Sequence, residues 1–378
     1  GDVEAGLGQA ERRVEATYET PAQYHNALEP HAIVAQWDGD RLIVDTPSQG
    51  LAMAKMRLAG LFGLNPKNIL VRSPFLGGGF GSKGFLSGPQ ILGVMAAKLV
   101  GRPVKLVLRR EQMFGPVGHR AETRQTLRLG TDASGALTAL DHHTLTATSR
   151  FDDFYEPASA ISRYLYAAPA VSTRHSGVRV DTGTPLFMRA PGESVGTFAL
   201  ESAIDELAVE LDMDPIELRK RNDPKIDPER DVPYSSRNLT RALDEGAKKF
   251  GWDKRQKAGT RREGEWLIGM GVAGAVRGNM LMESSAKVEI HPDGSATVSS
   301  AMTDIGTGSY TILAQIASEI LGIPVENITM SLGDTNDPPA AGSGGSWGAA
   351  SSGTAVYLAC EMLRGKLAKA MEVEEDGL

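Results

Sequence analysis

Two stretches of the chain repeat the same order of sequence patterns, and this repeat constrains the fold more than any other feature. Each stretch begins with alternating apolar residues on both sides of an Asp-Gly turn, a pattern typical of a β-hairpin. An apolar segment of helical spacing, a short strand, a glycine-rich loop and a second helical segment follow in the same order. The stretches begin at residues 32 and 286. We therefore predict an α+β protein built of two related lobes.

The repeat divides the chain into three expected parts. The first lobe covers residues 1–224, and the second lobe covers residues 266–378. Residues 225–265 are polar and rich in charge, with one short stretch of helical spacing near 239–250. We expect this segment to connect the lobes rather than to belong to either core.

Length and charge narrow the class of protein. The chain has 378 residues, more than the roughly 100–200 of one typical domain. Its net charge of −7 argues against nucleic acid as the main partner.

Cys360 has no second cysteine to pair with, and no Cys/His cluster is present, so we expect no metal ligand from the chain itself. No apolar run approaches the roughly 20 residues that span a bilayer, so no membrane span is expected.

Each repeat carries a glycine-rich loop between a strand and a helix, at residues 76–84 and 341–348. Such a loop lets main-chain N–H groups approach a phosphate closely, and the N-terminus of the next helix adds positive partial charge. One glycine loop by itself serves equally well as a tight turn. Two loops at equivalent positions of a repeat favour a phosphate-bearing ligand that the lobes share.

Other motifs fit less well. Residues 79–84 satisfy Gly-x-Gly-x-x-Gly, but no acidic residue follows about 20 positions later to bind a ribose, so a nicotinamide dehydrogenase is a minor alternative. Lys83 is followed by glycine, which does not fit a P-loop. His142 and His143 are neighbours in a strand pattern and face opposite sides, which argues against shared metal ligation.

Five further motifs are specific as a set. They are Asn-Ala-Leu-Glu-Pro-His-Ala at 26–32, Thr-Pro-Ser-Gln-Gly at 46–50, Gly-Gly-Gly-Phe-Gly-Ser-Lys at 77–83, Met-Arg-Ala-Pro-Gly-Glu at 188–193 with Ala-Leu-Glu-Ser-Ala-Ile-Asp-Glu-Leu-Ala at 199–208, and Asp-Ile-Gly-Thr-Gly at 304–308. With these motifs in this order, the chain resembles the molybdenum-cofactor-binding subunit of the xanthine dehydrogenase and aldehyde oxidase family. The resemblance covers essentially the whole chain.

The resemblance implies a molybdenum hydroxylase. In this family a molybdenum ion is held by a pterin dithiolene; a hydroxide on the metal, deprotonated by a glutamate, attacks the substrate carbon while hydride passes to a sulfido ligand. Electrons leave through iron–sulfur clusters, usually to a flavin, so water supplies the oxygen. The implied substrates are aldehydes, which become carboxylic acids. The implied partners are an iron–sulfur subunit and an FAD subunit.

The resemblance also implies roles for particular residues. Gln49 would hydrogen-bond an oxygen ligand of the metal, and Phe80 would border the substrate. Arg189 would lie in a loop over the pterin. The other expected cofactor-binding residues are Gly78, Gly79, Phe80 and Gly81 of the first glycine loop, Ile305, Gly306 and Thr307, and Gly345 and Ser346 of the second glycine loop.

Departures from the family pattern narrow the branch. Gly84 stands where xanthine-type enzymes have a glutamate, which argues against purine recognition, and Ala190 excludes the cysteine of carbon monoxide dehydrogenases. The segments at 188–193 and 304–311 are similar to bacterial three-subunit aldehyde oxidoreductases of the periplasmic type, which use the cytosine dinucleotide form of the cofactor. Hydroxylation of N-heterocycles and a non-catalytic assembly module of the same fold are the alternatives.

The family's catalytic glutamate lies in a segment beyond the equivalent of Leu378, and a small domain normally precedes the equivalent of Gly1. We therefore expect a fragment, a split-gene subunit or a truncated form, incomplete at both ends and inactive alone. The expected location is the cytoplasm, or the periplasm after export with a partner subunit.

Overall fold

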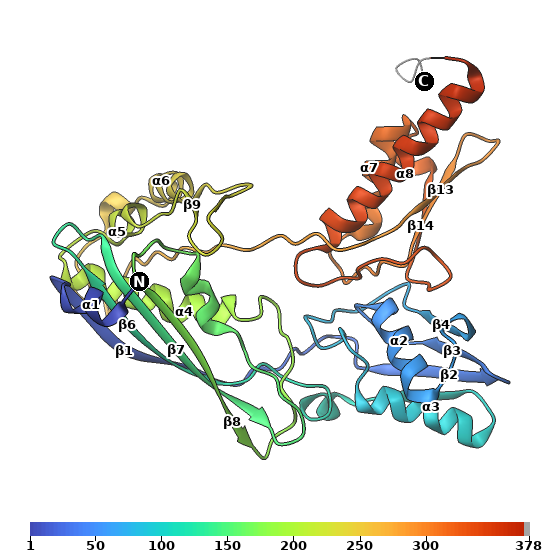
Figure 1. Cartoon of the computed structure of the whole chain (residues 1–378), viewed down its shortest axis with the longest axis horizontal. Coiled ribbons are helices and arrows are strands. Elements are labelled where there is room, and N and C mark those ends of the chain that lie inside the picture. Colours follow the sequence, from blue (N-terminus) through green and yellow to red (C-terminus); the bar gives the residue numbers. More distant parts are fainter. Residues whose placement is uncertain (374–378) are drawn as a thin grey trace. The chain divides into compact units, whose positions relative to one another are not determined.

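The computed structural model describes residues 1–373, which form two compact units (Figure 1). The first unit consists of residues 1–23, 120–185 and 189–277. The second unit consists of residues 24–119, 186–188 and the described residues from 278 onward. Each unit is therefore assembled from segments that are far apart in the sequence.

A four-stranded sheet forms the centre of the first unit. Its order is β1-β6-β7-β8, with β7 and β8 parallel and the other pairs antiparallel. The strands are β1 (Arg12–Thr20), β6 (Thr123–Thr131), β7 (Leu137–Ser149) and β8 (Val171–Val180). Threonine, valine and leucine recur along these strands, as expected for a pleated, half-buried surface.

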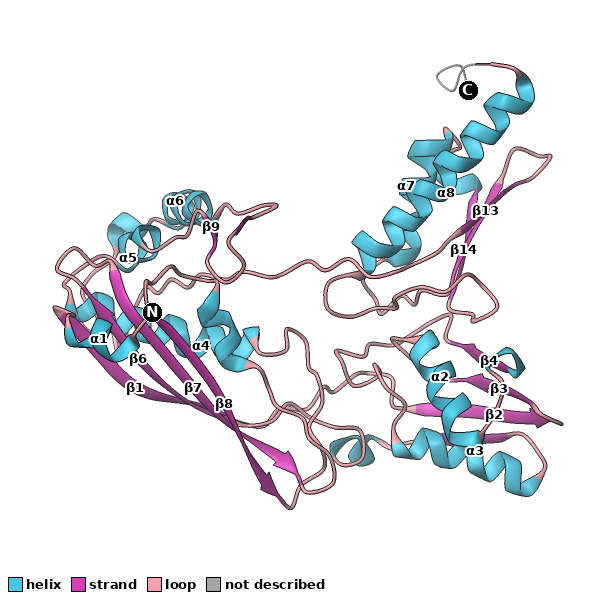
Figure 2. Cartoon of the chain, in the orientation of Figure 1, coloured by secondary structure: helices cyan, strands magenta, loops and turns pink. Residues whose placement is uncertain are grey.

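Helix α4 (Glu193–Glu210) covers one face of this sheet (Figure 2). Ala199, Ala203 and Leu207 follow at i, i+4 spacing and are fully buried against Leu127 and Leu140 of the sheet. The small alanines let the helix approach the strands closely, and the stripe supplies the core of this unit.

Shorter elements complete the first unit. They are α1 (Val3–Gly8), α5 (Pro215–Arg221), α6 (Leu239–Phe250), the strand pairs β9 (Ile226–Asp227) with β10 (Val232–Pro233) and β11 (Arg262–Glu263) with β12 (Trp266–Leu267), and the 3-10 helices η3 (Ala158–Arg163) and η4 (Trp252–Lys254). The predicted helix near 239–250 is therefore confirmed as α6.

Both repeats lie in the second unit. The first contains β2 (Ala32–Asp38), β3 (Arg41–Asp45), α2 (Leu51–Phe62), η1 (Pro66–Asn68), β4 (Ile69–Arg72) and α3 (Gly88–Val100), followed by β5 (Val104–Val107) and η2 (Arg110–Phe114). The second contains β13 (Lys287–Ile290), β14 (Ala296–Ser300), α7 (Ser309–Leu321), η5 (Val325–Asn327), β15 (Ile328–Leu332) and α8 (Gly348–Met371).

The two repeats have the same topology, which confirms the predicted α+β repeat. In each, a hairpin is antiparallel, and the strand after the first helix pairs in parallel with the second hairpin strand. The first helix of each repeat ends at a glycine in the left-handed region, Gly63 at φ 64° and Gly322 at φ 69°. Two helices pack on one face of each sheet, and Cys360 of α8 is buried in the second core.

The repeats contact each other through the ends of their parallel strands. The amide of Val71 donates to Thr335 Oγ1 at 2.9 Å, and the amide of Ser73 donates to the carbonyl of Gly333 at 2.7 Å. Tyr310 Oη donates to the carbonyl of Pro74 at 2.7 Å. These bonds place both repeats in one packed unit.

This arrangement differs from the expected division into residues 1–224, 225–265 and 266–378. The first repeat packs with the second repeat. The segments on either side of the first repeat, residues 1–23 and 120–185, belong instead to the first unit. The expected connection at 225–265 lies within the first unit, where Leu243 of α6 is buried. Sequence order alone carries no information about which distant segments share a core.

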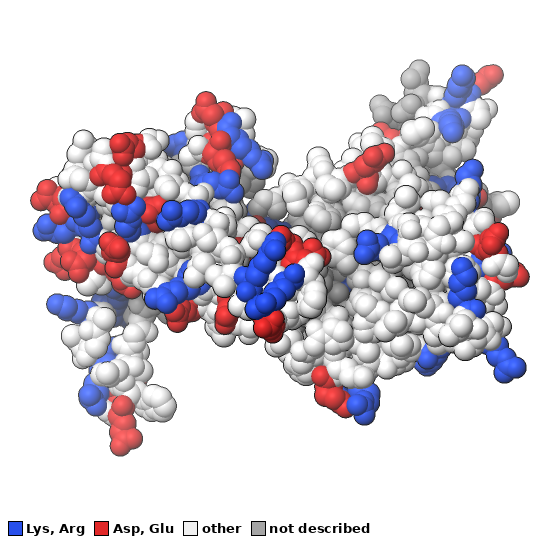
Figure 3. Space-filling view, turned by 60° about the horizontal axis from the view of Figure 1, so that its bottom comes forward, with Lys and Arg blue, Asp and Glu red and all other residues white. Residues whose placement is uncertain are grey.

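The surface carries both signs of charge. On the face shown in Figure 3, acidic and basic side chains are intermixed rather than gathered by sign. Within residues 1–373 no helix is both long enough and apolar enough to cross a membrane.

Candidate cofactor site

Gln49 lies in the loop between β3 and α2 and joins both glycine loops of the second unit. Its amide nitrogen Nε2 donates to the carbonyl of Ser343 at 2.9 Å, and its Oε1 accepts from the amide of Gly81 at 2.9 Å. Its main-chain N–H donates to Lys83 O at 2.8 Å, and its carbonyl accepts from Ser343 N at 2.7 Å. The side chain is buried, so these bonds fix its orientation.

The first glycine loop follows β4 and turns through three residues with positive φ: Gly78 at 85°, Phe80 at 55° and Gly81 at 111°. A Cβ at Gly79 would lie 2.4 Å from Gln49 Oε1, so only glycine allows Gln49 to approach the loop this closely. A Cβ at Gly81 would lie 2.1 Å from the carbonyl oxygen of Phe187. The glycines therefore serve the protein's own packing, and Phe80 remains 42% exposed.

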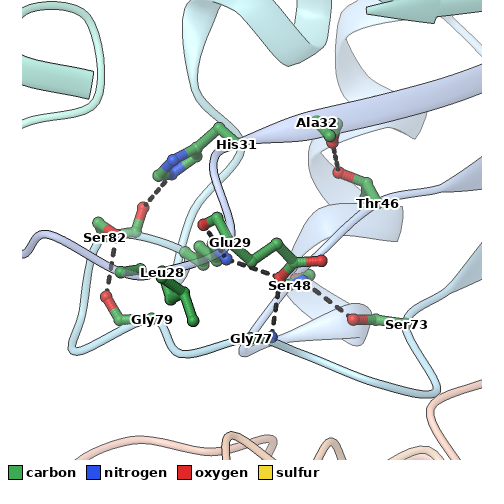
Figure 4. A network of polar contacts seen from close by, with 12 residues as sticks. Leu28, Glu29, His31, Ala32, Thr46, Ser48, Ser73, Gly77, Gly79 and Ser82 are labelled. Carbon is green, nitrogen blue, oxygen red and sulfur yellow. Dashed lines mark hydrogen bonds and ion pairs between the residues drawn. The ribbon is translucent and has the colours of Figure 1, made fainter. Parts of the chain in front are cut away.

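A segment before β2 holds this loop (Figure 4). His31 Nε2 bonds the carbonyl of Ser82 at 3.0 Å, and Glu29 contacts both Gly77 and Lys83. Burial lowers the pKa of His31 to about 4, so the ring is neutral at pH 7 and Nε2 donates to the carbonyl. Sequence reasoning did not assign these residues to the site, although Glu29 and His31 lie in one of the recognised motifs.

The loop between β14 and α7 occupies the position in the second repeat that the Gln49 loop occupies in the first. The Asp304 carboxylate accepts the amides of Gly306 at 2.8 Å and Thr307 at 2.9 Å, and that of Gly308 at 3.3 Å. Gly306 and Thr307, two of the residues expected to bind the cofactor, thus already have an acceptor for their amides. Ile305 lies between Asp304 and Gly306 in this turn.

The second glycine loop contains three residues with positive φ: Gly342 at 75°, Gly345 at 48° and Ser346 at 58°. A Cβ at Gly342 would lie 2.4 Å from the main-chain oxygen of Gln49. A Cβ at Gly345 would lie 2.0 Å from the ring of Trp347, whose Nε1 donates to Gly342 O at 3.2 Å. The loop is a compact turn that presents its backbone instead of side chains.

Arg189 belongs to the first unit, whereas the other expected site residues belong to the second. Its carbonyl accepts Arg120 Nη2 at 2.6 Å. Arg120 Nε lies 3.3 Å from Glu156 Oε1, which also accepts the amide of Gly192 at 2.7 Å. Both side chains of this ion pair are buried, and burial raises the pKa of Glu156. The pair holds the 189–192 turn, and sequence reasoning missed it because its members lie far apart in the chain.

The second unit therefore brings together Gln49, the first glycine loop and the second glycine loop. The groups it offers are main-chain amides and carbonyls and the neutral carboxamide of Gln49. Within residues 1–373 no three His, Cys, Asp or Glu side chains gather as a metal-binding set. These neutral donors fit a cofactor whose phosphate and pterin groups need hydrogen bonds and whose metal is held by its own organic ligand.

Comparison with known proteins gives the family. Residues 1–223 and 245–378 match the molybdopterin cofactor-binding domain, so the chain belongs to that family. It is 44% identical, over 376 residues, to the aldehyde oxidoreductase molybdenum-binding subunit PaoC of Escherichia coli O157:H7, covering 98% of this chain and 51% of that protein. The resemblance drawn from the five motifs is thereby confirmed. The chain spans about half the length of the curated relatives it matches.

Solved structures share the fold. Quinoline 2-oxidoreductase from Pseudomonas putida 86 superposes with a TM-score of 0.84 at 22% identity, over 99% of this chain and 52% of that chain. Aldehyde oxidoreductase from Desulfovibrio gigas gives 0.83 at 22% identity, over 99% of this chain and 44% of that chain. At this identity the likeness concerns the fold alone.

Proposed function

We propose that the chain forms the cofactor-binding part of a molybdenum hydroxylase that oxidises aldehydes to carboxylic acids, with water as the oxygen source. The observation that carries the proposal is the pair of hydrogen bonds from the Gln49 side chain to Gly81 and Ser343, which joins a glycine loop from each repeat. The identity to an aldehyde oxidoreductase subunit supports the substrate class.

We assign the cofactor to the groups around Gln49. Its Nε2 carries two hydrogens; one goes to Ser343 O, and the second is the one we assign to an oxygen atom of the cofactor. A neutral amide suits this task because it donates without adding charge. The backbone of Gly78, Gly79 and Gly81 would contact the cofactor beside it.

The remaining assignments follow the order of the loops. Ile305, Gly306, Thr307, Gly345 and Ser346 would hold the pterin and phosphate groups. Because Asp304 already accepts the amides of Gly306 and Thr307, we expect the carbonyls of this turn to accept N–H groups of the pterin and the Thr307 hydroxyl to donate to a phosphate oxygen. When bound, the molybdenum cofactor supplies the two-electron oxidation of the aldehyde.

Phe80 and Arg189 are assigned separately. Phe80 is partly exposed in the loop whose Gly81 bonds Gln49, and it would border the substrate. Arg189 would serve the pterin through the turn that Arg120 holds. We further propose the cytosine dinucleotide form of the cofactor, with an iron–sulfur subunit and an FAD subunit as partners that carry the electrons away.

Isotope labelling of the full-length protein in its natural assembly tests this function. The purified assembly is given an aldehyde and an electron acceptor in water enriched in oxygen-18. We expect at least one labelled oxygen atom in each molecule of acid formed, because the aldehyde's own oxygen also exchanges with water through its hydrate. A parallel reaction in ordinary water under oxygen-18 gas should give unlabelled acid. Labelled acid under those conditions, or a molybdenum-loaded assembly that forms no acid from any aldehyde, would contradict the proposal. Parallel trials with N-heterocycles test that alternative.

A further inference from the structure

Glu29 contacts both ends of the first glycine loop. At the start of the loop, its Oε2 accepts the amide of Gly77 at 2.9 Å, and its own amide donates to Gly77 O at 3.1 Å. At the end of the loop, Lys83 Nζ donates to the same Oε2 at 2.8 Å and to the Glu29 carbonyl at 2.9 Å. One residue thus closes the loop into a ring of hydrogen bonds.

The two partners are buried to different degrees. The Lys83 side chain is fully buried, whereas the Glu29 side chain is 37% exposed. An ammonium group removed from water needs an anionic partner and hydrogen-bond acceptors, and Glu29 supplies both. Gly77 also packs tightly here, because a Cβ on it would lie 2.5 Å from Glu29 Cβ.

The segment that carries Glu29 is itself fixed. Arg110 of η2 donates to the carbonyls of Ala27 at 2.8 Å and Leu28 at 2.6 Å. On the other side, His31 bonds the carbonyl of Ser82 within the loop at 3.0 Å. The segment that carries Glu29 is therefore held by bonds on both sides, of which Figure 4 shows the one from His31 to Ser82.

We propose that Glu29 and Lys83 are positioning residues: their ion pair sets the conformation of Gly78, Gly79, Phe80 and Gly81, the backbone that would meet the cofactor. This inference rests on the proposed function for its consequence in cofactor binding. The conformational part stands on the contacts of the loop alone, so the two parts are separable by experiment.

The test uses the full-length protein in its natural assembly and three variants. Glu29→Ala removes the carboxylate, Lys83→Met removes the ammonium, and Glu29→Gln keeps an acceptor for Gly77 and Lys83 without the charge. Glu111→Ala is the matched control, because Glu111 is an exposed partner of Arg109 in the same unit.

Amide hydrogen exchange, molybdenum content and melting temperature are measured for each variant. For Glu29→Ala and Lys83→Met we expect exchange at residues 78–82 to rise about tenfold, with little change elsewhere in the unit. Molybdenum content should fall in the same variants. Glu29→Gln should restore part of both properties, and Glu111→Ala should match the wild type.

Unchanged amide exchange at residues 78–82 in Glu29→Ala and in Lys83→Met would overturn the inference. So would faster exchange spread over the whole unit with a lower melting temperature, because that pattern indicates a general structural role. If Glu29→Ala fails to fold, Glu29→Gln and Lys83→Met still decide the question. A wild type that carries no molybdenum contradicts the proposed function, while the exchange data still test the positioning of the loop.

Discussion

At the scale of single residues, the site depends on side chains that hold the backbone of loops. Gln49 is the clearest case, because its carboxamide uses both its oxygen and its nitrogen to join Gly81 and Ser343. Its place in the site was predicted from a family motif. Its bonds to the two loops were not predictable, because they depend on how distant segments pack.

Replacing Gln49 with leucine should destabilise the protein. Leucine has a similar size but leaves the amide of Gly81 and the carbonyl of Ser343 without their partner. We expect a loss of about 1–3 kcal/mol in the free energy of unfolding, the usual cost of an unsatisfied buried polar group. Denaturant titration measures it. A Gln49→Leu variant as stable as the wild type would show that these bonds contribute nothing to the fold.

A second prediction at this scale concerns pH. Burial lowers the pKa of His142 to about 3, below its usual value in an unfolded chain, and its ring bonds Ser162 and Gln125. Between these two pKa values the unfolded state binds a proton that the folded state excludes. His142 therefore contributes full stability above about pH 6.5, and this contribution falls as the pH decreases towards 3.

The measurement is the free energy of unfolding from pH 7.5 to 4.5 for the wild type and for His142→Gln. The variant keeps a polar side chain but has no titrating ring. We expect its stability to fall less steeply with decreasing pH than that of the wild type. Parallel curves would mean that His142 is not protected from protonation in the folded state.

At the scale of elements, each repeat is a hairpin, a helix, a parallel strand, a loop and a helix. This order was predictable because periodicity, Asp-Gly turns and helix-ending glycines are local signals. The Asp304 turn was predictable only as a motif: nothing local indicates that its carboxylate takes up the amides of its own loop.

The glycine that ends α2 provides a matched pair of substitutions. Gly63 has a φ of 64° and open space where a Cβ would lie, so Gly63→Ala should cost about 1 kcal/mol through backbone strain alone. Gly60 also has open space but lies inside the same helix, so Gly60→Ala should stabilise the protein by about 0.5–1 kcal/mol. Thermal unfolding of both variants checks the opposite signs. Equal changes in stability for the two variants would contradict the left-handed conformation of Gly63 at the end of α2.

At the scale of the whole molecule, the chain builds two units from alternating segments. The family fold was predictable because several motifs occurred in order. The unit boundaries were not, because the first repeat packs against the second across more than half of the chain, and the residues between them return to a different sheet. Arg120 and Glu156 of the first unit illustrate the same point, since neither carries a local signal for their ion pair.

A fragment of residues 1–224 should therefore fail to fold cooperatively. It contains the first repeat without the second, and so it lacks Ser343 and Thr335, the partners of Gln49 and Val71. It also lacks α6 of the first unit. Circular dichroism during heating should show a broad, non-cooperative change, compared with a sharp transition for the longer protein. A sharp transition at the same temperature would indicate that the sequence-based lobe is a folding unit.

The most direct test of the central claim is the molybdenum and nucleotide content of the full-length protein, purified in its natural assembly. The sample is ashed for mass spectrometry of the metal, and acid releases the nucleotide for chromatography. We predict one molybdenum atom and one cytidine monophosphate for each copy of the chain. A pure assembly that contains neither would contradict the claim that these glycine loops hold a molybdenum cofactor.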